Sequence, residues 1–198
     1  IDINRKVYAL EHTIQQAQIA SVMEMVPSYR SLLVRFDPYI NSQLEMEELI
    51  SNLLPSLVVN DESLHREIEI PVHYGGEDGP DLKFVADHNG LTPQEVIDIH
   101  SSHTYPVYMM GFTPGFPYLG GMDPRIATPR IKRPRLRVPA GSVGIAGEQT
   151  GIYSIQSPGG WRLIGRTDLQ LYDPESETPF LLSPGDRIRF VPVEGGSA

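Results

Sequence analysis

The stretch from Gly111 to Trp161 constrains the fold of this chain most strongly, because it concentrates glycine, proline, aromatic and basic residues. Six of the 16 Lys and Arg residues lie between Arg125 and Arg137, although the formal net charge of the chain is -9. Proline lacks the amide hydrogen that helices and central strands need, and glycine carries an entropic cost in regular structure. The stretch is therefore predicted to form ordered loops and short strands. Such loops are often functional, so we expect the functional site here.

The rest of the composition is that of an ordinary soluble globular protein, with 198 residues, 40% hydrophobic and 21% charged. This length allows one large domain or two small ones, and two is the favoured interpretation. No apolar run reaches 18 residues, so no membrane span is predicted. The chain has no cysteine, which excludes disulfides, thiol nucleophiles and cysteine zinc sites. The lack of cysteine and of a signal peptide favours the cytoplasm.

The charge balance also indicates the kind of partner. An acidic chain is a poor nucleic-acid binder, and the basic cluster is interrupted by prolines, which suits a small anionic ligand better than a phosphate backbone. The sequence begins at Ile1 and not at a methionine, so a preceding segment is expected to be missing.

Hydrophobic periodicity predicts a small α+β layer in the first part of the chain. Apolar residues at steps of three and four indicate the first helix, and the capping-box spacing of Ser42 and Glu45 indicates the start of the second. The expected elements are a helix over about residues 1–18, a strand pair or one bent strand over 22–26 and 32–36, a helix from Ser42, and a strand over 67–74.

A domain boundary is predicted at the glycine-rich, acidic segment Gly75–Pro80, which gives domains over residues 1–78 and 79–198. The second domain is expected to begin with a helix over 81–88 that ends at Gly90. Thr92, Pro93 and Glu95 form a strong start signal for another helix. From Tyr105 onward, short apolar pieces separated by turns indicate a barrel or a sandwich.

Common catalytic motifs are absent. The sequence contains no P-loop, no dinucleotide-binding fingerprint and no nucleophile elbow. Ser142, Thr150 and Ser157 have no adjacent base in sequence, so no nucleophile is assigned. His100 and His103 have a spacing that could bind a metal with a carboxylate, but a partly exposed helix end is the favoured interpretation, and no metal is predicted.

The basic cluster is a better candidate for a site. Prolines next to Arg130 and Arg137 stiffen the backbone, so less entropy is lost when a guanidinium is held toward a carboxylate or phosphate. The alternative is a solvated charged loop. For the turn Gly159-Gly160-Trp161, a core anchor and a binding role are equally supported.

These same segments resemble a known family. The sequence is similar to the KipI and allophanate-hydrolase-subunit-1 family, many members of which are the B-type subunit of bacterial 5-oxoprolinase, at GFTPGFPYLGG, RVPAGSV, GEQTGIY, SPGGW, LIGRT, PSYRSLLVRFDP and SPGDRIRFVPV. The resemblance implies an α+β fold in which a small N-terminal α+β domain precedes a cyclophilin-like β-barrel domain. Members begin with an extra strand that this sequence lacks, so the first sheet is expected to be incomplete.

The resemblance also implies partners and a reaction. The chain is expected to be a subunit of an ATP-dependent 5-oxoprolinase, which opens 5-oxo-L-proline to L-glutamate and is inactive without its other subunits. The implied partners are a C-type subunit of the KipA and allophanate-hydrolase-subunit-2 family and an A-type subunit. A related unit forms half of a carboxyltransferase domain in urea carboxylase. The alternative function is that of KipI itself, which inhibits a sporulation histidine kinase.

The expected site follows from motif position and side-chain type, without an assigned catalytic residue. The predicted anion-binding residues are Arg130, Arg137, Arg166, Gly141, Ser142, Gly159 and Gly160. The predicted apolar wall or interface consists of Phe112, Pro114, Phe116, Tyr118 and Trp161.

Overall fold

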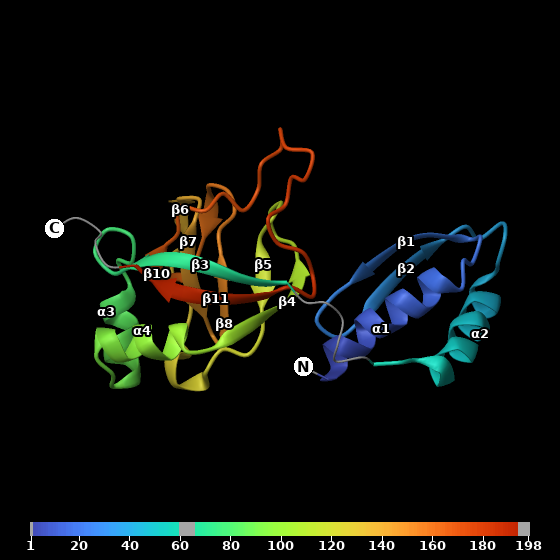
Figure 1. Cartoon of the computed structure of the whole chain (residues 1–198), viewed down its shortest axis with the longest axis horizontal. Helices are drawn as coiled ribbons and strands as arrows, with labels where there is room; N and C mark the ends of the chain where they lie inside the picture. Colours follow the sequence, from blue (N-terminus) through green and yellow to red (C-terminus); the bar gives the residue numbers. More distant parts are fainter. Residues whose placement is uncertain (1, 60–65, 194–198) are drawn as a thin grey trace. The chain divides into compact units, whose positions relative to one another are not determined.

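The structure is a computed structural model that describes residues 2–59 and 66–193. The chain divides into two compact units, Ile1–Leu64 and His65–Ala198, whose helices and strands are labelled in Figure 1. Among the described residues, no helix has the length and apolar character needed to cross a membrane.

The first unit is a small α+β layer, as predicted, except that the predicted strand over 67–74 belongs to the second unit. Its elements are α1 (Asp2–Gln16), β1 (Val22–Pro27), β2 (Leu32–Phe36), α2 (Gln43–Leu53) and the 3-10 helix η1 (Leu54–Ser56). The strands β1 and β2 pair antiparallel in a two-stranded sheet, and α1 packs on both strands and on α2. Val7, Ile14 and Met46 are buried in this unit.

The predicted capping box begins α2. The Ser42 hydroxyl accepts a hydrogen bond from the Glu45 amide, and a Glu45 carboxylate oxygen accepts one from the Ser42 amide at 2.7 Å. Each side chain thereby satisfies a backbone donor that the first helical turn leaves unpaired.

The second unit is built around a closed β-barrel with strand order β10-β3-β11-β4-β5-β8-β7. The barrel strands are β3 (Glu67–Tyr74), β4 (Thr104–Met110), β5 (Pro117–Leu119), β7 (Ser142–Ala146), β8 (Gln149–Ile152), β10 (Arg162–Arg166) and β11 (Arg187–Pro192). β11 runs parallel to β3, and the other neighbouring pairs are antiparallel. The barrel confirms the fold class that the resemblance implied.

Further elements surround the barrel. They are α3 (Leu82–Asn89), α4 (Pro93–Ser101), the 3-10 helix η2 (Pro124–Ile126), and the strands β6 (Arg135–Val138) and β9 (Ser157–Gly159), which form a separate two-stranded sheet. The helix α4 starts with the predicted capping box of Thr92 and Glu95, and α3 ends at Gly90, whose φ of 67° is a left-handed cap.

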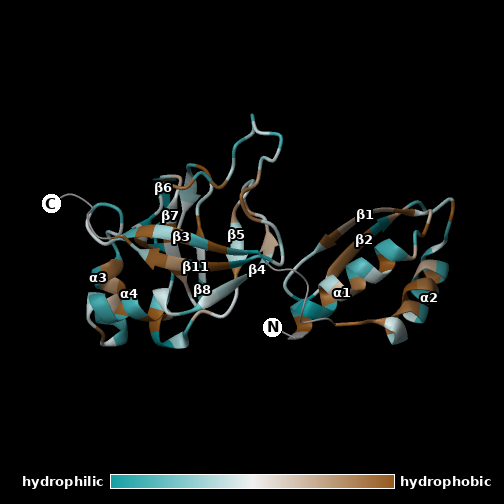
Figure 2. Ribbon diagram, in the orientation of Figure 1, coloured by the Kyte–Doolittle hydropathy of each residue, from teal (hydrophilic) through white to brown (hydrophobic). Residues whose placement is uncertain are grey.

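The barrel interior is the main hydrophobic core. Alternate residues of β3 point into it, so Ile70 and Val72 are buried while Glu67 and Glu69 are exposed, and Figure 2 shows this alternation along the strand. Val85 of α3 and Val96 of α4 belong to the same core, so both helices pack onto the barrel.

The predicted domain boundary at Gly75–Pro80 requires a correction, because this segment is a turn inside the second unit. β3, which precedes it, pairs with both β10 and β11 of the barrel. The Gly75 amide donates to the Ile164 carbonyl, and a Cβ at Gly79 would lie 2.2 Å from the same oxygen. The glycines allow close packing on β10 and do not mark a linker. The division between the units instead falls within residues 60–65, and residues 194–198 of the predicted second domain also lie outside the described part.

Candidate functional site

A second buried cluster lies on the outside of the barrel wall, between that wall and the β6–β9 sheet. Ala146 and Leu163 of the barrel strands and Val138 of the small sheet belong to it. Phe116, Tyr153 and Trp161, which lie directly before or after barrel strands, complete the cluster, and Tyr118 packs against it. We call Phe112, Phe116, Tyr118, Tyr153 and Trp161 the outer aromatic cluster.

Two glycines of the barrel let these rings approach the backbone. A Cβ on Gly151 would lie 3.1 Å from both Phe116 Cζ and Trp161 Cζ3, and one on Gly144 would lie 3.1 Å from Trp161 Cβ. The rings of Phe116 and Trp161 meet edge to face, with centroids 5.5 Å apart and planes at 90°. This arrangement is a favourable one for aromatic pairs and fixes both rings on the barrel wall.

Phe112 is the exposed end of the outer aromatic cluster. Its side chain touches Phe116 and Tyr153, but the residue is 61% exposed and its φ is 64°. A bulky residue with positive φ and an exposed ring is costly for folding, and such strain is concentrated at functional sites. Phe112 is therefore the predicted wall residue that is best placed to contact a ligand or partner.

The other predicted wall residues support this surface. Phe116 and Trp161 are almost fully buried, and Tyr118 is half-buried against Phe116. Pro114 lies beside Phe112 on the loop, where its carbonyl accepts a 2.6 Å hydrogen bond from the Ser154 hydroxyl. The structure thus brings all five predicted residues into one region.

Tyr153 is a member of the cluster that the sequence analysis missed. Its ring is buried beneath Gly159, where a Cβ would lie only 2.2 Å from the Tyr153 hydroxyl oxygen. Burial raises the pKa of Tyr153, while the Trp161 amide and the positive charges of Arg130 and Arg135 act in the opposite direction. The motif GEQTGIY was a usable signal, since it places an aromatic residue directly after a barrel strand.

The six basic residues between 125 and 137 fall into two classes. Arg125 pairs with Asp123, and Arg135 pairs with Asp81. The exposed side chains of the other four make no hydrogen bond or ion pair with any described residue: Arg130, Lys132, Arg133 and Arg137. Two of the three predicted arginines, Arg130 and Arg137, are therefore in the class that is available to an anion.

Arg166, the third predicted arginine, has different neighbours. It lies on β10 opposite Ser142 of β7 and His73 of β3, and its Nη1 is 3.8 Å from a carboxylate oxygen of Asp78. Its Nε is buried and has no hydrogen-bond partner among the described residues. The charge of Arg166 is thus partly balanced by the protein.

Gly141 and Ser142 were predicted to bind an anion, which would require their backbone amides to be free, and the structure corrects this prediction. The Gly141 amide donates to the Tyr153 carbonyl at 2.7 Å, and the Ser142 amide donates to the Pro139 carbonyl at 3.3 Å. A Cβ on Gly141 would lie 2.0 Å from the Thr167 carbonyl oxygen, and its φ is 81°. These amides serve the turn before β7 and are not free to bind an anion.

The glycines of the second predicted pair have separate roles. Gly159 makes room for Tyr153, whereas the Gly160 carbonyl accepts a 2.9 Å hydrogen bond from the Ile131 amide. This bond joins the basic loop to the end of β9, so Gly160 fixes the loop.

His100 is part of the barrel core and not of a metal site. It is fully buried, with Nδ1 2.7 Å from the Tyr74 hydroxyl and Nε2 2.9 Å from the Thr150 hydroxyl. Burial, with a contribution from His103, lowers the pKa of His100 to about 3, so the ring is neutral. The described residues contain no group of three or more His, Cys, Asp or Glu that could hold a metal ion. The expected partly exposed helix end thus does not describe His100.

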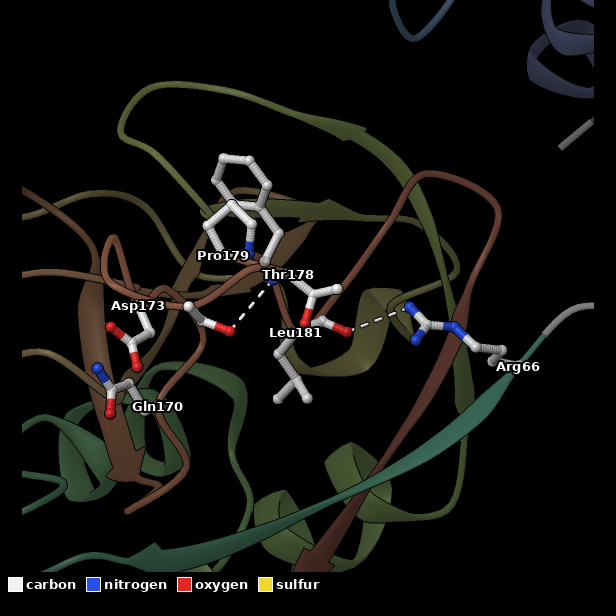
Figure 3. Close-up of a pocket in the computed structure, with 8 residues that line it drawn as sticks. Arg66, Gln170, Asp173, Thr178, Pro179 and Leu181 are labelled. Atoms are coloured by element: carbon white, nitrogen blue, oxygen red, sulfur yellow. Dashed lines mark hydrogen bonds between the residues drawn. The ribbon is translucent and has the colours of Figure 1, made fainter.

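A cavity of about 390 Å³ lies elsewhere in the second unit. It is lined by Arg66, Gln170, Asp173, Ser176, Thr178, Pro179, Phe180 and Leu181. Figure 3 shows Arg66 reaching the Leu181 carbonyl, and the same guanidinium pairs with Asp186. None of the predicted site residues lines this cavity, and its one arginine is already neutralised.

The family of the chain follows from comparison with known proteins. The family described as carboxyltransferase domain, subdomain C and D, matches residues 1–182. The chain is 46% identical to the B-type subunit of 5-oxoprolinase from Bacillus subtilis (strain 168), in an alignment that covers 97% of this chain and 86% of that protein.

The chain is also similar in fold to solved structures. The conserved uncharacterized protein PH0987 from Pyrococcus horikoshii is 51% identical, with a TM-score of 0.63 over 96% of this chain and 88% of that chain. TTHA0988 is 42% identical, with a TM-score of 0.82 over 99% of this chain, which spans only 38% of TTHA0988. The chain therefore belongs to the carboxyltransferase-domain family that contains the B-type subunit of 5-oxoprolinase, as its motifs indicated.

Proposed function

We propose that this protein is a non-autonomous subunit of an ATP-dependent 5-oxoprolinase, which opens 5-oxo-L-proline to L-glutamate together with a C-type and an A-type subunit. The observation that carries the proposal is that the chain belongs to the family of the B-type 5-oxoprolinase subunit. The structure adds that the strained, exposed Phe112 lies on the same 111–161 stretch as the unpaired arginines. An apolar centre with arginine at its rim is typical of a protein interface.

The chemistry of the substrate fits these side chains. 5-Oxoproline carries a carboxylate, and an ATP-dependent opening of its lactam develops negative charge on oxygen atoms. Guanidinium groups bind carboxylates and phosphates through paired hydrogen bonds and stabilise such developing charge. Arg130 and Arg137 are exposed and unpaired among the described residues, so they are the proposed contacts to substrate or ATP in the assembled complex. Arg166 is a weaker candidate because Asp78 lies beside it.

The described residues explain why partners would be needed. A hydroxyl and a histidine at hydrogen-bond distance can act as nucleophile and base, and Thr150 and His100 are 2.9 Å apart. Both are fully buried in the barrel, so no substrate reaches them. The Ser154 hydroxyl, which lies nearer to Phe112, donates to the Pro114 carbonyl. The partner subunits are therefore proposed to supply the reacting groups and the greater part of the ATP site, in the cytoplasm that the sequence analysis favoured.

The test is reconstitution from purified subunits. The chain alone is expected to release no glutamate from 5-oxoproline with ATP, whereas a mixture with the C-type and A-type subunits is expected to do so. Size-exclusion chromatography should show a complex with the C-type subunit. Turnover by the chain alone would refute the non-autonomous role. Failure to bind the C-type subunit, with tight binding to a sporulation histidine kinase, would support the inhibitor instead.

A further inference from the structure

One carboxylate, that of Asp81, joins three separate segments of the second unit. It lies at the start of α3, and only 12% of its side chain is exposed. The Arg135 Nη2 donates to both of its oxygens, at 3.0 and 2.9 Å, and the Leu163 amide donates to Oδ2 at 2.8 Å. The sequence separations are 54 and 82 residues, so the carboxylate ties α3 to β6 and to β10.

A second arginine extends this network to the beginning of the basic loop. The Arg162 Nη1 is 3.8 Å from Asp81 Oδ1, and its guanidinium carbon lies 3.6 Å above the Phe84 ring of α3. The Arg162 Nε donates to the Pro129 carbonyl at 3.3 Å. Pro129 directly precedes Arg130, so Arg162 fixes the backbone at one end of the loop while Asp81 helps to hold Arg162.

Arg135 holds the other end of the loop. Besides its bonds to Asp81, its Nη1 donates to the Trp161 carbonyl at 3.3 Å. The intervening Ile131 amide donates to the Gly160 carbonyl. Residues 129–135 are therefore anchored at both ends through side chains that converge on one carboxylate. Charged hydrogen bonds at partly buried positions are stronger than exposed pairs, which contribute little.

We infer that Asp81 is a positioning residue, which holds the 129–135 loop against β9 so that Arg130 and its unpaired neighbours face an anionic ligand in a fixed geometry. The expected effect of Asp81 on turnover rests on the proposed function. The expected effect of Asp81 on the loop does not. Pre-organisation of this kind lowers the entropy that a flexible arginine loses when it binds.

The first experiment uses the 198-residue chain without partners. Amide hydrogen exchange is measured by NMR for Asp81→Asn, which keeps the size of the side chain and an acceptor for the Leu163 amide but removes the charge. The Ile131 amide is expected to exchange at least tenfold faster, while amides of the β7–β8 ladder keep their wild-type rates. Asp87→Asn is the matched control, because Asp87 forms an exposed pair with Lys83 on the same helix.

Arg135→Gln provides an independent variant, since it releases the loop but leaves Asp81 to bind the Leu163 amide and Arg162. The double variant with Asp81→Asn should exchange at Ile131 no faster than Asp81→Asn alone, because the Asp81 change by itself already removes the partner of Arg135. Wild-type exchange at Ile131 in Arg135→Gln and in every folded Asp81 variant would overturn the inference.

The second experiment measures the reconstituted complex. Asp81→Asn is expected to raise the KM for 5-oxoproline or ATP at least fivefold at a temperature at which the variant is fully folded, and Asp87→Asn to behave as wild type. A released loop with wild-type KM and kcat would show that Asp81 holds the loop without positioning a ligand contact, and so would overturn the assigned role. If the wild-type mixture has no turnover, the proposed function fails, and the exchange rates alone decide whether Asp81 anchors the loop.

Discussion

The buried histidine of the barrel predicts a specific dependence of stability on pH. His100 is neutral in the folded chain because burial lowers its pKa to about 3, whereas an unfolded histidine has a pKa of about 6.5. Between these values the unfolded chain binds the extra proton, so the free energy of unfolding falls as the pH falls. At pH 5, which is about 1.5 units below the unfolded pKa, the loss amounts to about 2 kcal/mol.

The assay is equilibrium urea unfolding at pH 7.5 and at pH 5.0, followed by fluorescence. Trp161 is the single tryptophan of the chain and lies in the second unit, so the signal reports on the barrel. His100→Gln is the comparison, because glutamine can bond to Tyr74 and Thr150 but does not titrate. The wild type should lose about 2 kcal/mol more than this variant between the two pH values.

The difference between the wild type and His100→Gln reports on His100 and not on the other histidines. His73 and His103 lie near Asp168 and Asp123, and the wild type and His100→Gln both retain these pairs. Equal losses for wild type and His100→Gln, within about 0.5 kcal/mol, would refute the conclusion that His100 is held neutral in the core.

Two further predictions concern the organisation of the second unit. A fragment of residues 66–193 should unfold cooperatively. A fragment of residues 81–193 should not, because it lacks β3, the strand between β10 and β11. Cooperative unfolding of the shorter fragment would support the domain boundary predicted from sequence. Gly159→Ala should destabilise the barrel by about 1–3 kcal/mol, since its Cβ would collide with Tyr153. Gly160→Ala, whose Cβ would have its nearest neighbour at 3.7 Å, should cost under about 0.5 kcal/mol, and equal urea midpoints would contradict this account.

Local patterns in the sequence were sufficient for many of the elements. Capping signals at Ser42 and Thr92 located the starts of α2 and α4, and alternation located β3. These features depend on residues a few positions apart, so periodicity and capping rules capture them. The fold of the second unit came from the resemblance, since short apolar pieces fit a barrel and a sandwich equally well.

Long-range partners explain what the sequence could not reveal. The alternation of β3 is the same whichever domain it joins, and its neighbours β10 and β11 follow about ninety or more residues later. The basic cluster was located as a whole, but the separation of paired Arg135 from unpaired Arg137 depends on Asp81, which lies 54 residues before Arg135. The amides of Gly141 and Ser142 were misjudged because their acceptors are set by folding: the Gly141 amide donates to the Tyr153 carbonyl, which follows β8, and the Ser142 amide donates to the Pro139 carbonyl.

The central claim is that unpaired arginines of the 111–161 stretch act in a site that the partner subunits complete. The most direct measurement is ATP-dependent glutamate release by the reconstituted complex that contains Arg137→Ala, with Arg125→Ala as the control from the same cluster. Arg137 is exposed and unpaired among the described residues, whereas Arg125 is neutralised by Asp123. The account predicts that Arg137→Ala lowers turnover at least a hundredfold, with stability changed by under about 0.5 kcal/mol, and that Arg125→Ala keeps wild-type turnover. Wild-type turnover by both variants would contradict it.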